Sequence, residues 1–98
     1  MLQQSPNDPF LRYAMALELH KASSIEPAIE HLEALRQDRP EYLALYYQLG
    51  AFLQDAGRYR QAIEVWRAGE AVAKSQGDSK TQLELESVRE DLEDLLEY

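Results

Sequence analysis

Apolar residues recur with the period of an α-helix along most of the sequence, and this pattern predicts five helices. The first helix has a capping residue, Asn7 or Asp8, followed by a proline at its first turn, and it extends to about Lys21. The second covers about residues 26–37 and ends before a proline, because the residue that precedes a proline disfavours the helical conformation. Residues 1–7 are polar and are expected to precede the first helix without regular structure.

Turn-forming residues separate the other three helices. Gly57 lies between two apolar segments, residues 46–53 and 62–66, and therefore predicts a turn between a third and a fourth helix. A fifth helix is predicted after a glycine, with Asp78 or Ser79 as its cap. Its apolar stripe has helical spacing and consists of Leu85, Val88, Leu92, Leu95 and Leu96.

The pattern of the first two helices returns after 34 residues. This shift superposes Tyr13 on Tyr47, Met15 on Leu49, Ala16 on Gly50, Leu19 on Leu53, Ile25 on Tyr59, Ala28 on Ala62, Ile29 on Ile63 and Leu32 on Trp66. Small side chains at equivalent positions let the two helices of a hairpin approach closely, while the larger ones fill the space around them. We therefore expect Gly50 and Ala62 to be tightly packed where helices cross.

The second unit resembles the tetratricopeptide repeat (TPR), whose pattern is W-x2-L-G-x2-Y, then A-x3-F, then P. The matching residues are Tyr46, Leu49, Gly50, Leu53, Ala62 and Trp66, and Lys74 stands where proline is usual. Thirty-four residues is also the period of this repeat, and the resemblance covers about residues 8–75. It implies an all-α fold within a single domain, 1–98. That fold is an α-α superhelix of two TPR hairpins, at 8–40 and 41–75, followed by a C-terminal capping helix at 78–97.

The two ends of this stack are expected to differ. The stripe of the second unit that should face the first is Leu45, Leu49, Phe52 and Ala56, and its equivalent in the first unit is Leu11, Met15, Glu18 and Ala22. Because Glu18 replaces Phe52, we expect this face of the first unit to meet water rather than a further repeat. At the other end, the fifth helix is expected to cover the second unit with its apolar side and to turn its acidic side outward.

Charge and composition exclude several classes of partner. The formal net charge of the 98 residues is −8, and residues 78–98, with eight acids and two bases, contribute −6 of it. A nucleic-acid backbone would be repelled, so no nucleic acid is expected as a partner. The acidity is interpreted as a solvated helix face, with adaptation to a salty cytoplasm as the alternative. The sequence has no cysteine, no apolar run long enough for a membrane span and no signal peptide, so a cytoplasmic protein is expected.

The sequence offers no arrangement that is typical of an enzyme or a cofactor site. His20 and His31 have neither histidine nor glutamate three or four residues away, so they are interpreted as surface side chains rather than metal ligands. Acidic pairs on the fifth helix could hold a hard cation, but a solvated face is the preferred interpretation. We expect no catalytic residue, cofactor or metal, and a metal-binding or enzymatic accessory role is the least favoured alternative.

The resemblance implies where a partner binds. In TPR proteins the first helix of each hairpin lines a concave groove and contacts the ligand from fixed positions. The corresponding residues here are Phe10, Tyr13, Leu17, His20 and Lys21 in the first unit and Ala44, Tyr47, Ala51, Gln54 and Asp55 in the second. The resemblance thus implies an apolar floor with a polar rim, in a non-catalytic module that binds a peptide or protein segment.

The same positions argue against one ligand of the family. Some TPR proteins hold the C-terminal carboxylate of a peptide in a clamp of lysines, asparagines and an arginine, whereas the matching positions here are Tyr13, Leu17 and Gln48. An apolar or amphipathic peptide therefore fits better than an acidic tail. The alternative is a structural unit whose apolar surface forms a homodimer interface.

Overall fold

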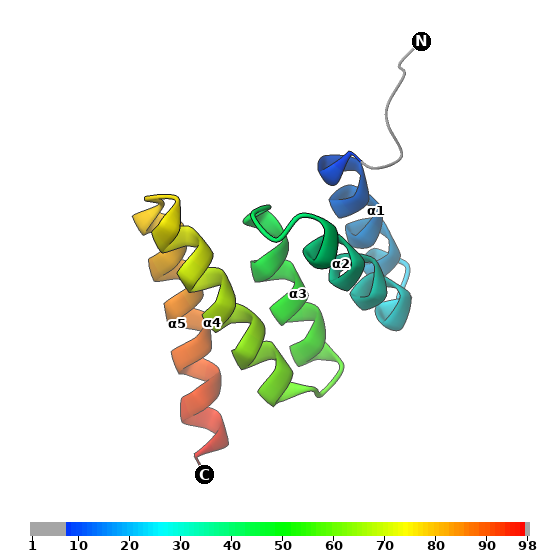
Figure 1. The fold of residues 1–98 in the computed structure, drawn as a ribbon. Coiled ribbons are helices and arrows are strands. Elements are labelled where there is room, and N and C mark those ends of the chain that lie inside the picture. The colour runs from blue at the N-terminus through cyan, green and yellow to red at the C-terminus, as the bar shows by residue number, and fades with distance from the viewer. Residues whose placement is uncertain (1–7, 98) are drawn as a thin grey trace.

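The computed structural model describes residues 8–97, which form five helices and no strand (Figure 1). The helices are α1 (Pro9–Lys21), α2 (Ile25–Asp38), α3 (Ala44–Asp55), α4 (Tyr59–Ser75) and α5 (Ser79–Leu96). Each predicted helix is present, and the boundaries predicted for α1, α2 and α5 agree within one or two residues. The segment 1–7, for which no regular structure is expected, lies outside the described residues, as does residue 98.

Aspartates cap the first and last helices, as their sequences predict. The carboxylate of Asp8 accepts a hydrogen bond from the backbone N–H of Phe10 at 2.9 Å. Asp78 accepts one from the backbone N–H of Thr81 at 3.0 Å and another from its hydroxyl at 2.8 Å. These hydrogen bonds from Thr81 lower the pKa of Asp78, so the cap stays ionised at the positive end of the α5 dipole.

The chain folds as two antiparallel hairpins and a final helix. The pairs α1–α2 and α3–α4 pack within their hairpins, α2 packs against α3 to join them, and α5 packs along α4. Figure 1 shows that α1, α3 and α5 run in one direction and that α2 and α4 run in the other. Helix α5 thus follows α4 in the way that α3 follows α2.

The second hairpin is held by a tryptophan that lies against a glycine. A Cβ atom at Gly50 would come within 2.1 Å of Trp66 Nε1, so the indole fills the space that any side chain at position 50 would need. The indole N–H donates a hydrogen bond to the carbonyl of Tyr47 at 3.1 Å, and Trp66 is buried. Ala62 is also fully buried. The prediction of close helix crossing at Gly50 and Ala62 is confirmed.

A second glycine on α4 brings α3 and α5 against the same helix. A Cβ atom at Gly69 would lie 2.6 Å from the Cβ of Tyr46 and 3.0 Å from a methyl group of Leu85. Gly69 therefore lets one residue from each neighbouring helix pack against the α4 backbone. Tyr46 is buried and donates its hydroxyl hydrogen to the carbonyl of Pro40 at 2.5 Å, so the phenol has a partner inside the fold.

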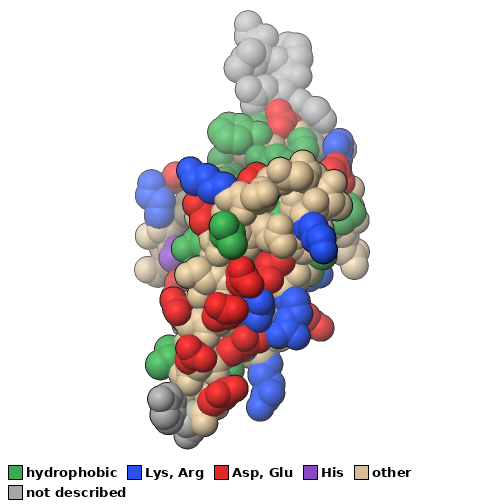
Figure 2. Space-filling model, turned by 90° about the vertical axis from the view of Figure 1, so that its left-hand side faces the viewer, with side chains coloured by type: hydrophobic (Ala, Val, Ile, Leu, Met, Phe, Trp, Pro, Cys, Tyr) green, Lys and Arg blue, Asp and Glu red, His purple; other side chains and the backbone are tan. Residues whose placement is uncertain are grey.

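Polar contacts also attach α5 to α4. Arg89 pairs with Glu70 on α4, and its guanidinium also donates to Glu93 at 2.9 Å, which in turn accepts from Arg67 at 2.6 Å. The hydrogen bonds to Glu70 raise the pKa of Arg89 above its ordinary value. Four other acids of α5 are exposed: Glu84, Glu90, Asp91 and Asp94. Figure 2, which views the molecule from the side of α4 and α5, shows Asp and Glu side chains gathered there.

Only part of the apolar stripe predicted for α5 is in the core. Leu85 and Leu92 are buried and Val88 is half-buried against the core, as expected. Leu95 and Leu96 were predicted to continue the stripe, and this is wrong, because both are exposed. Leu96 lies beside Arg60 and Ile63, in the first two turns of α4, so little of α4 extends past this end of α5 to cover it.

Equivalent turns join the helices of the two hairpins, but only one has a glycine at its strained position. Gly57 has a φ of 79°, and Ser23, 34 residues earlier, has a φ of 66°. In both turns the next backbone N–H reaches back to the helix: Ser24 donates to Leu19 at 2.9 Å and Arg58 to Leu53 at 2.8 Å. This is the hydrogen bond of a helix C-terminal motif that favours glycine. Ser23 therefore holds a left-handed conformation that an L side chain disfavours.

We predict that Ser23→Gly stabilises the protein by about 0.5–1 kcal/mol, because relief of the left-handed strain exceeds the extra entropy of glycine in the unfolded chain. The matched control, Gly57→Ser, should destabilise by a similar amount. Urea unfolding of both variants measures the effect. A loss of stability on Ser23→Gly would show that the serine side chain stabilises the turn more than its backbone strain costs.

Candidate protein-binding surface

The ten residues expected to contact a partner differ widely in exposure. Phe10 is 63% exposed and Tyr47 is 41% exposed, which is high for aromatic side chains. The smaller or charged members that are also exposed are Lys21, Ala44 and Asp55. The remaining members are half-buried: Tyr13, Leu17, His20, Ala51 and Gln54. Exposed apolar area is therefore concentrated at Phe10 and Tyr47.

Two polar members of the set pair with each other where α1 meets α3. The ring of His20 stacks on Phe52, with centroids 4.2 Å apart and planes 5° apart, and its Nε2 lies 2.9 Å from a carboxylate oxygen of Asp55. Phe52 is one of the residues predicted to face the first unit, and this contact confirms it. Lys21 lies at the end of the same helix and approaches Glu18 at 3.4 Å, in a fully solvated pair.

The aromatic contact of Tyr13 also joins the hairpins. Its ring meets Tyr42 edge to face, with centroids 5.9 Å apart, and both side chains are half-buried against the core. Burial, together with the nearby Tyr13 and Asp8, raises the pKa of Tyr42, so this phenol stays neutral. Leu17 packs against the core as well. Tyr13 and Leu17 thus present one side to solvent and the other to the interior.

The backbone of Tyr47 is fixed, whereas its ring faces solvent. The Trp66 indole holds the Tyr47 carbonyl, and the side chain lines a hollow of about 450 Å³ together with Glu84, Ser87 and Val88 of α5. The last helix therefore shares a surface with α3. The sequence predicted only a capping role for α5, because the 34-residue register does not continue cleanly into it and puts Glu84 at the position equivalent to Gly50.

Comparisons with known proteins show which family has this architecture. No family model matches the sequence. The chain is 31% identical over 85 residues to a TPR repeat-containing protein of Pseudomonas aeruginosa, an alignment that covers 87% of this chain and 81% of that protein. The chain belongs to the tetratricopeptide repeat family. Members of this family generally act in protein–protein interaction.

Solved TPR structures agree over almost the whole fold. The solution structure of a tetratricopeptide repeat domain protein from Salinibacter ruber superposes with a TM-score of 0.90 at 34% identity, covering 94% of this chain and 93% of that one. The crystal structure of a tetratricopeptide repeat domain protein from the same organism gives a TM-score of 0.84 at 34% identity, covering 90% and 98%. The all-α TPR superhelix expected from the sequence is therefore confirmed.

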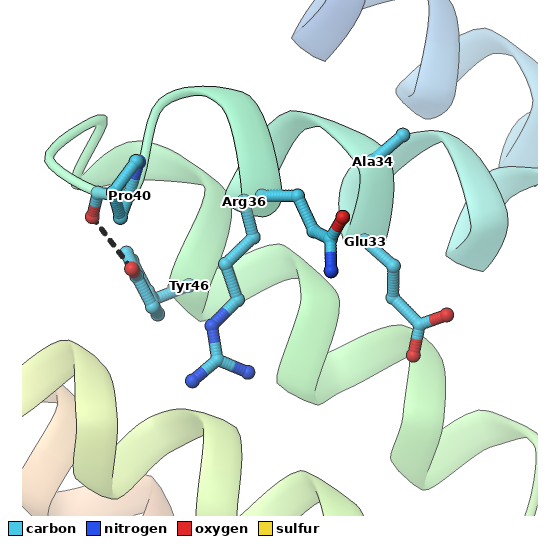
Figure 3. A pocket seen from close by; sticks show the side chains of 6 residues that line it. Glu33, Ala34, Arg36, Pro40 and Tyr46 are labelled. Atoms are coloured by element: carbon cyan, nitrogen blue, oxygen red, sulfur yellow. Dashed lines mark hydrogen bonds between the residues drawn. The ribbon is translucent and has the colours of Figure 1, made fainter.

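Two further hollows of this TPR domain lie away from the expected contact residues. One, of about 610 Å³, is lined by residues of α2, the following loop and α3 (Figure 3). In it the Arg36 guanidinium lies 5.5 Å from the centre of the Tyr46 ring. The other, of about 350 Å³, lies on the outer side of α1 and is almost entirely apolar apart from Glu18.

The outer face of α1 is the end of the stack at which no further repeat is expected. Its lining residues are Leu11, Ala14, Met15, Glu18, Leu19 and Ala22. Glu18 is exposed and Met15 is 54% exposed, so this face does meet solvent in the single chain. Of the pair considered as metal ligands, His31 is exposed and His20 is held by Phe52 and Asp55.

Among residues 8–97, no three or more His, Cys, Asp or Glu side chains are grouped so that they could hold a metal ion. In the same part of the chain, no helix is both long enough and apolar enough to cross a membrane. The described residues do offer features that could bind a partner: exposed aromatic rings, hollows at the surface and the acidic face of α5.

Proposed function

We propose that this TPR domain is a non-catalytic module that binds a peptide or protein segment across the face formed by α1, α3 and α5. The observation that carries the proposal is Tyr47, which is 41% exposed and lines a hollow of about 450 Å³. Tyrosine offers a large contact area, loses little conformational entropy and keeps its hydroxyl in water when its ring is covered.

The position of Tyr47 is set before any partner arrives. Its carbonyl accepts the Trp66 hydrogen bond at 3.1 Å, and Gly50, one turn later on α3, lies against the same indole. An anchor on a rigid helix binds more tightly than one on a mobile segment, because less order is imposed on binding. Phe10, 63% exposed on α1, supplies a second apolar contact in the set carried over from the family.

The other residues of the set have supporting roles in this proposal. Tyr13 and Leu17 are the apolar floor that the family register implies, and both are half-buried against the core. His20 and Asp55 form a rim whose members already pair, so a ligand would meet their exposed edges rather than free charges. Lys21, Ala44, Ala51 and Gln54 complete the surface.

The test compares two tyrosines of nearly equal exposure. Tyr47→Ala should abolish capture of a partner by the immobilised domain. Tyr59→Ala, which removes the ring of a residue that is 43% exposed at the start of α4, should leave capture unchanged. Both variants should keep their stability within about 1 kcal/mol, as expected for surface positions. Affinity capture followed by quantitative mass spectrometry gives the result. Equal loss of the same partner from both variants would place binding elsewhere.

A second candidate function is homodimerisation, which the apolar hollow on the outer face of α1 favours. Apolar patches of this kind commonly mark association surfaces. If this candidate is correct, light scattering should give twice the mass of one chain at high concentration, and Met15→Lys should return the mass to that of one chain. A mass of one chain at every concentration would exclude dimerisation and leave partner binding as the function.

A further inference from the structure

Helix α5 presents a second face to solvent besides the one that packs on α4. Leu85, Leu92 and the Arg89–Glu70 pair lie toward α4. Glu84, Ser87 and Val88 instead line the hollow that contains the Tyr47 ring. Leu83, next to Glu84, is 63% exposed. The part of the binding surface contributed by α5 thus combines apolar side chains with a carboxylate.

The solvent face of α5 carries more acids than bases: Glu84 and Asp91 lie on it, and Lys80, one turn before Glu84, forms no ion pair with that residue among residues 8–97. Glu84 is exposed, and no ion pair joins it to any other residue between positions 8 and 97. Asp91, one turn beyond Ser87, is exposed and equally without an ion pair in that range. The net charge of −6 in residues 78–98 adds to the field over the hollow. An incoming acidic segment would be repelled and a basic one attracted.

The lining of the hollow therefore favours a ligand that has two properties. Tyr47 and Val88 offer apolar contact, and Glu84 beside them offers a single carboxylate at the edge of that contact. We infer that the partner segment carries a lysine or arginine close in sequence to a bulky apolar residue. The apolar side chain covers the Tyr47 ring, and the cation pairs with Glu84. This inference rests on the proposed function and adds the chemistry of the partner, with α5 as the helix that selects it.

The experiment uses the whole chain and two labelled synthetic peptides in fluorescence anisotropy. Both peptides have about eight residues, enough to span roughly 27 Å when extended, with leucine at alternate positions. One has lysine and the other glutamate at the positions between. The lysine peptide should bind at least about tenfold more tightly than the glutamate peptide, and its affinity should fall as salt rises.

Charge reversal identifies the residue responsible. Glu84→Lys should lower the affinity of the domain for the lysine peptide about three- to tenfold and raise its affinity for the glutamate peptide. The matched control is Glu64→Lys, the same change at an exposed residue of α4 that does not line the hollow, and it should have little effect on either peptide. If Glu84→Lys and Glu64→Lys change the peptide affinities equally, the net charge of the domain rather than Glu84 selects the peptide, and the inference is overturned. An absence of binding by the lysine peptide would overturn it as well.

Two further outcomes separate this inference from the proposed function. If both peptides bind with equal affinity and Tyr47→Ala abolishes both, the surface binds partners without charge selection, so only the inference fails. If the lysine peptide binds and Tyr47→Ala leaves it unchanged, the binding surface itself is wrong. Sedimentation of the free chain adds one check, because a dimer that Glu84→Lys dissociates would make a second copy the occupant instead of a basic segment.

Discussion

The contact between the Trp66 indole and the backbone at Gly50 is the constraint on which the rest of the second hairpin depends. With a Cβ at position 50 only 2.1 Å from the indole nitrogen, α3 and α4 can cross at this distance only if residue 50 has no side chain. The indole hydrogen bond to the Tyr47 carbonyl then fixes the backbone beside the exposed Tyr47 ring. A single contact thus sets the helix crossing and orients the anchor of the proposed binding surface.

The same crossing governs how α5 joins the fold. Once α4 is held against α3, Gly69 on α4 brings Tyr46 from α3 and Leu85 from α5 to the same stretch of backbone. Leu85 and Leu92 bury the apolar side of α5, and Arg89 adds its pair with Glu70. The opposite side of α5 is left beside Tyr47, with its acids outward. The helix that closes the stack therefore also contributes to the surface at which a partner is proposed to bind.

Much of the fold could be predicted from sequence because it follows from local rules. The aspartate caps and the apolar periodicity locate the helix ends, and the 34-residue repeat places Gly50 opposite Trp66. Contacts that depend on the exact path of neighbouring helices could not be predicted. Gly69 has Leu35 as its equivalent in the first hairpin, so the repeat pattern does not predict a close helix contact at position 69. Leu95 and Leu96 fit the helical stripe but are exposed, and Leu96 lies beside the first two turns of α4, where that helix begins.

Contacts between surface residues could not be predicted from the sequence either. The repeat register brought His20 and Asp55 to the same rim, but it could not reveal that they pair or that His20 stacks on Phe52. Tyr42 precedes α3 and belongs to no family position, so its contact with Tyr13 has no signal in the sequence.

A double-mutant cycle at Gly50 and Trp66 tests the central claim most directly. The first hairpin has Ala16 and Leu32 at the equivalent positions, both fully buried, so Gly50→Ala and Trp66→Leu together would give the second hairpin the same pair. Gly50→Ala alone should destabilise by about 1–3 kcal/mol or more, because the added methyl group meets the indole. In the Trp66→Leu background it should be neutral or stabilising by up to about 1 kcal/mol, as expected for glycine to alanine in a helix. Urea unfolding of the four proteins gives the coupling energy, which we predict to exceed about 1 kcal/mol. Additive effects of the two substitutions would contradict the account.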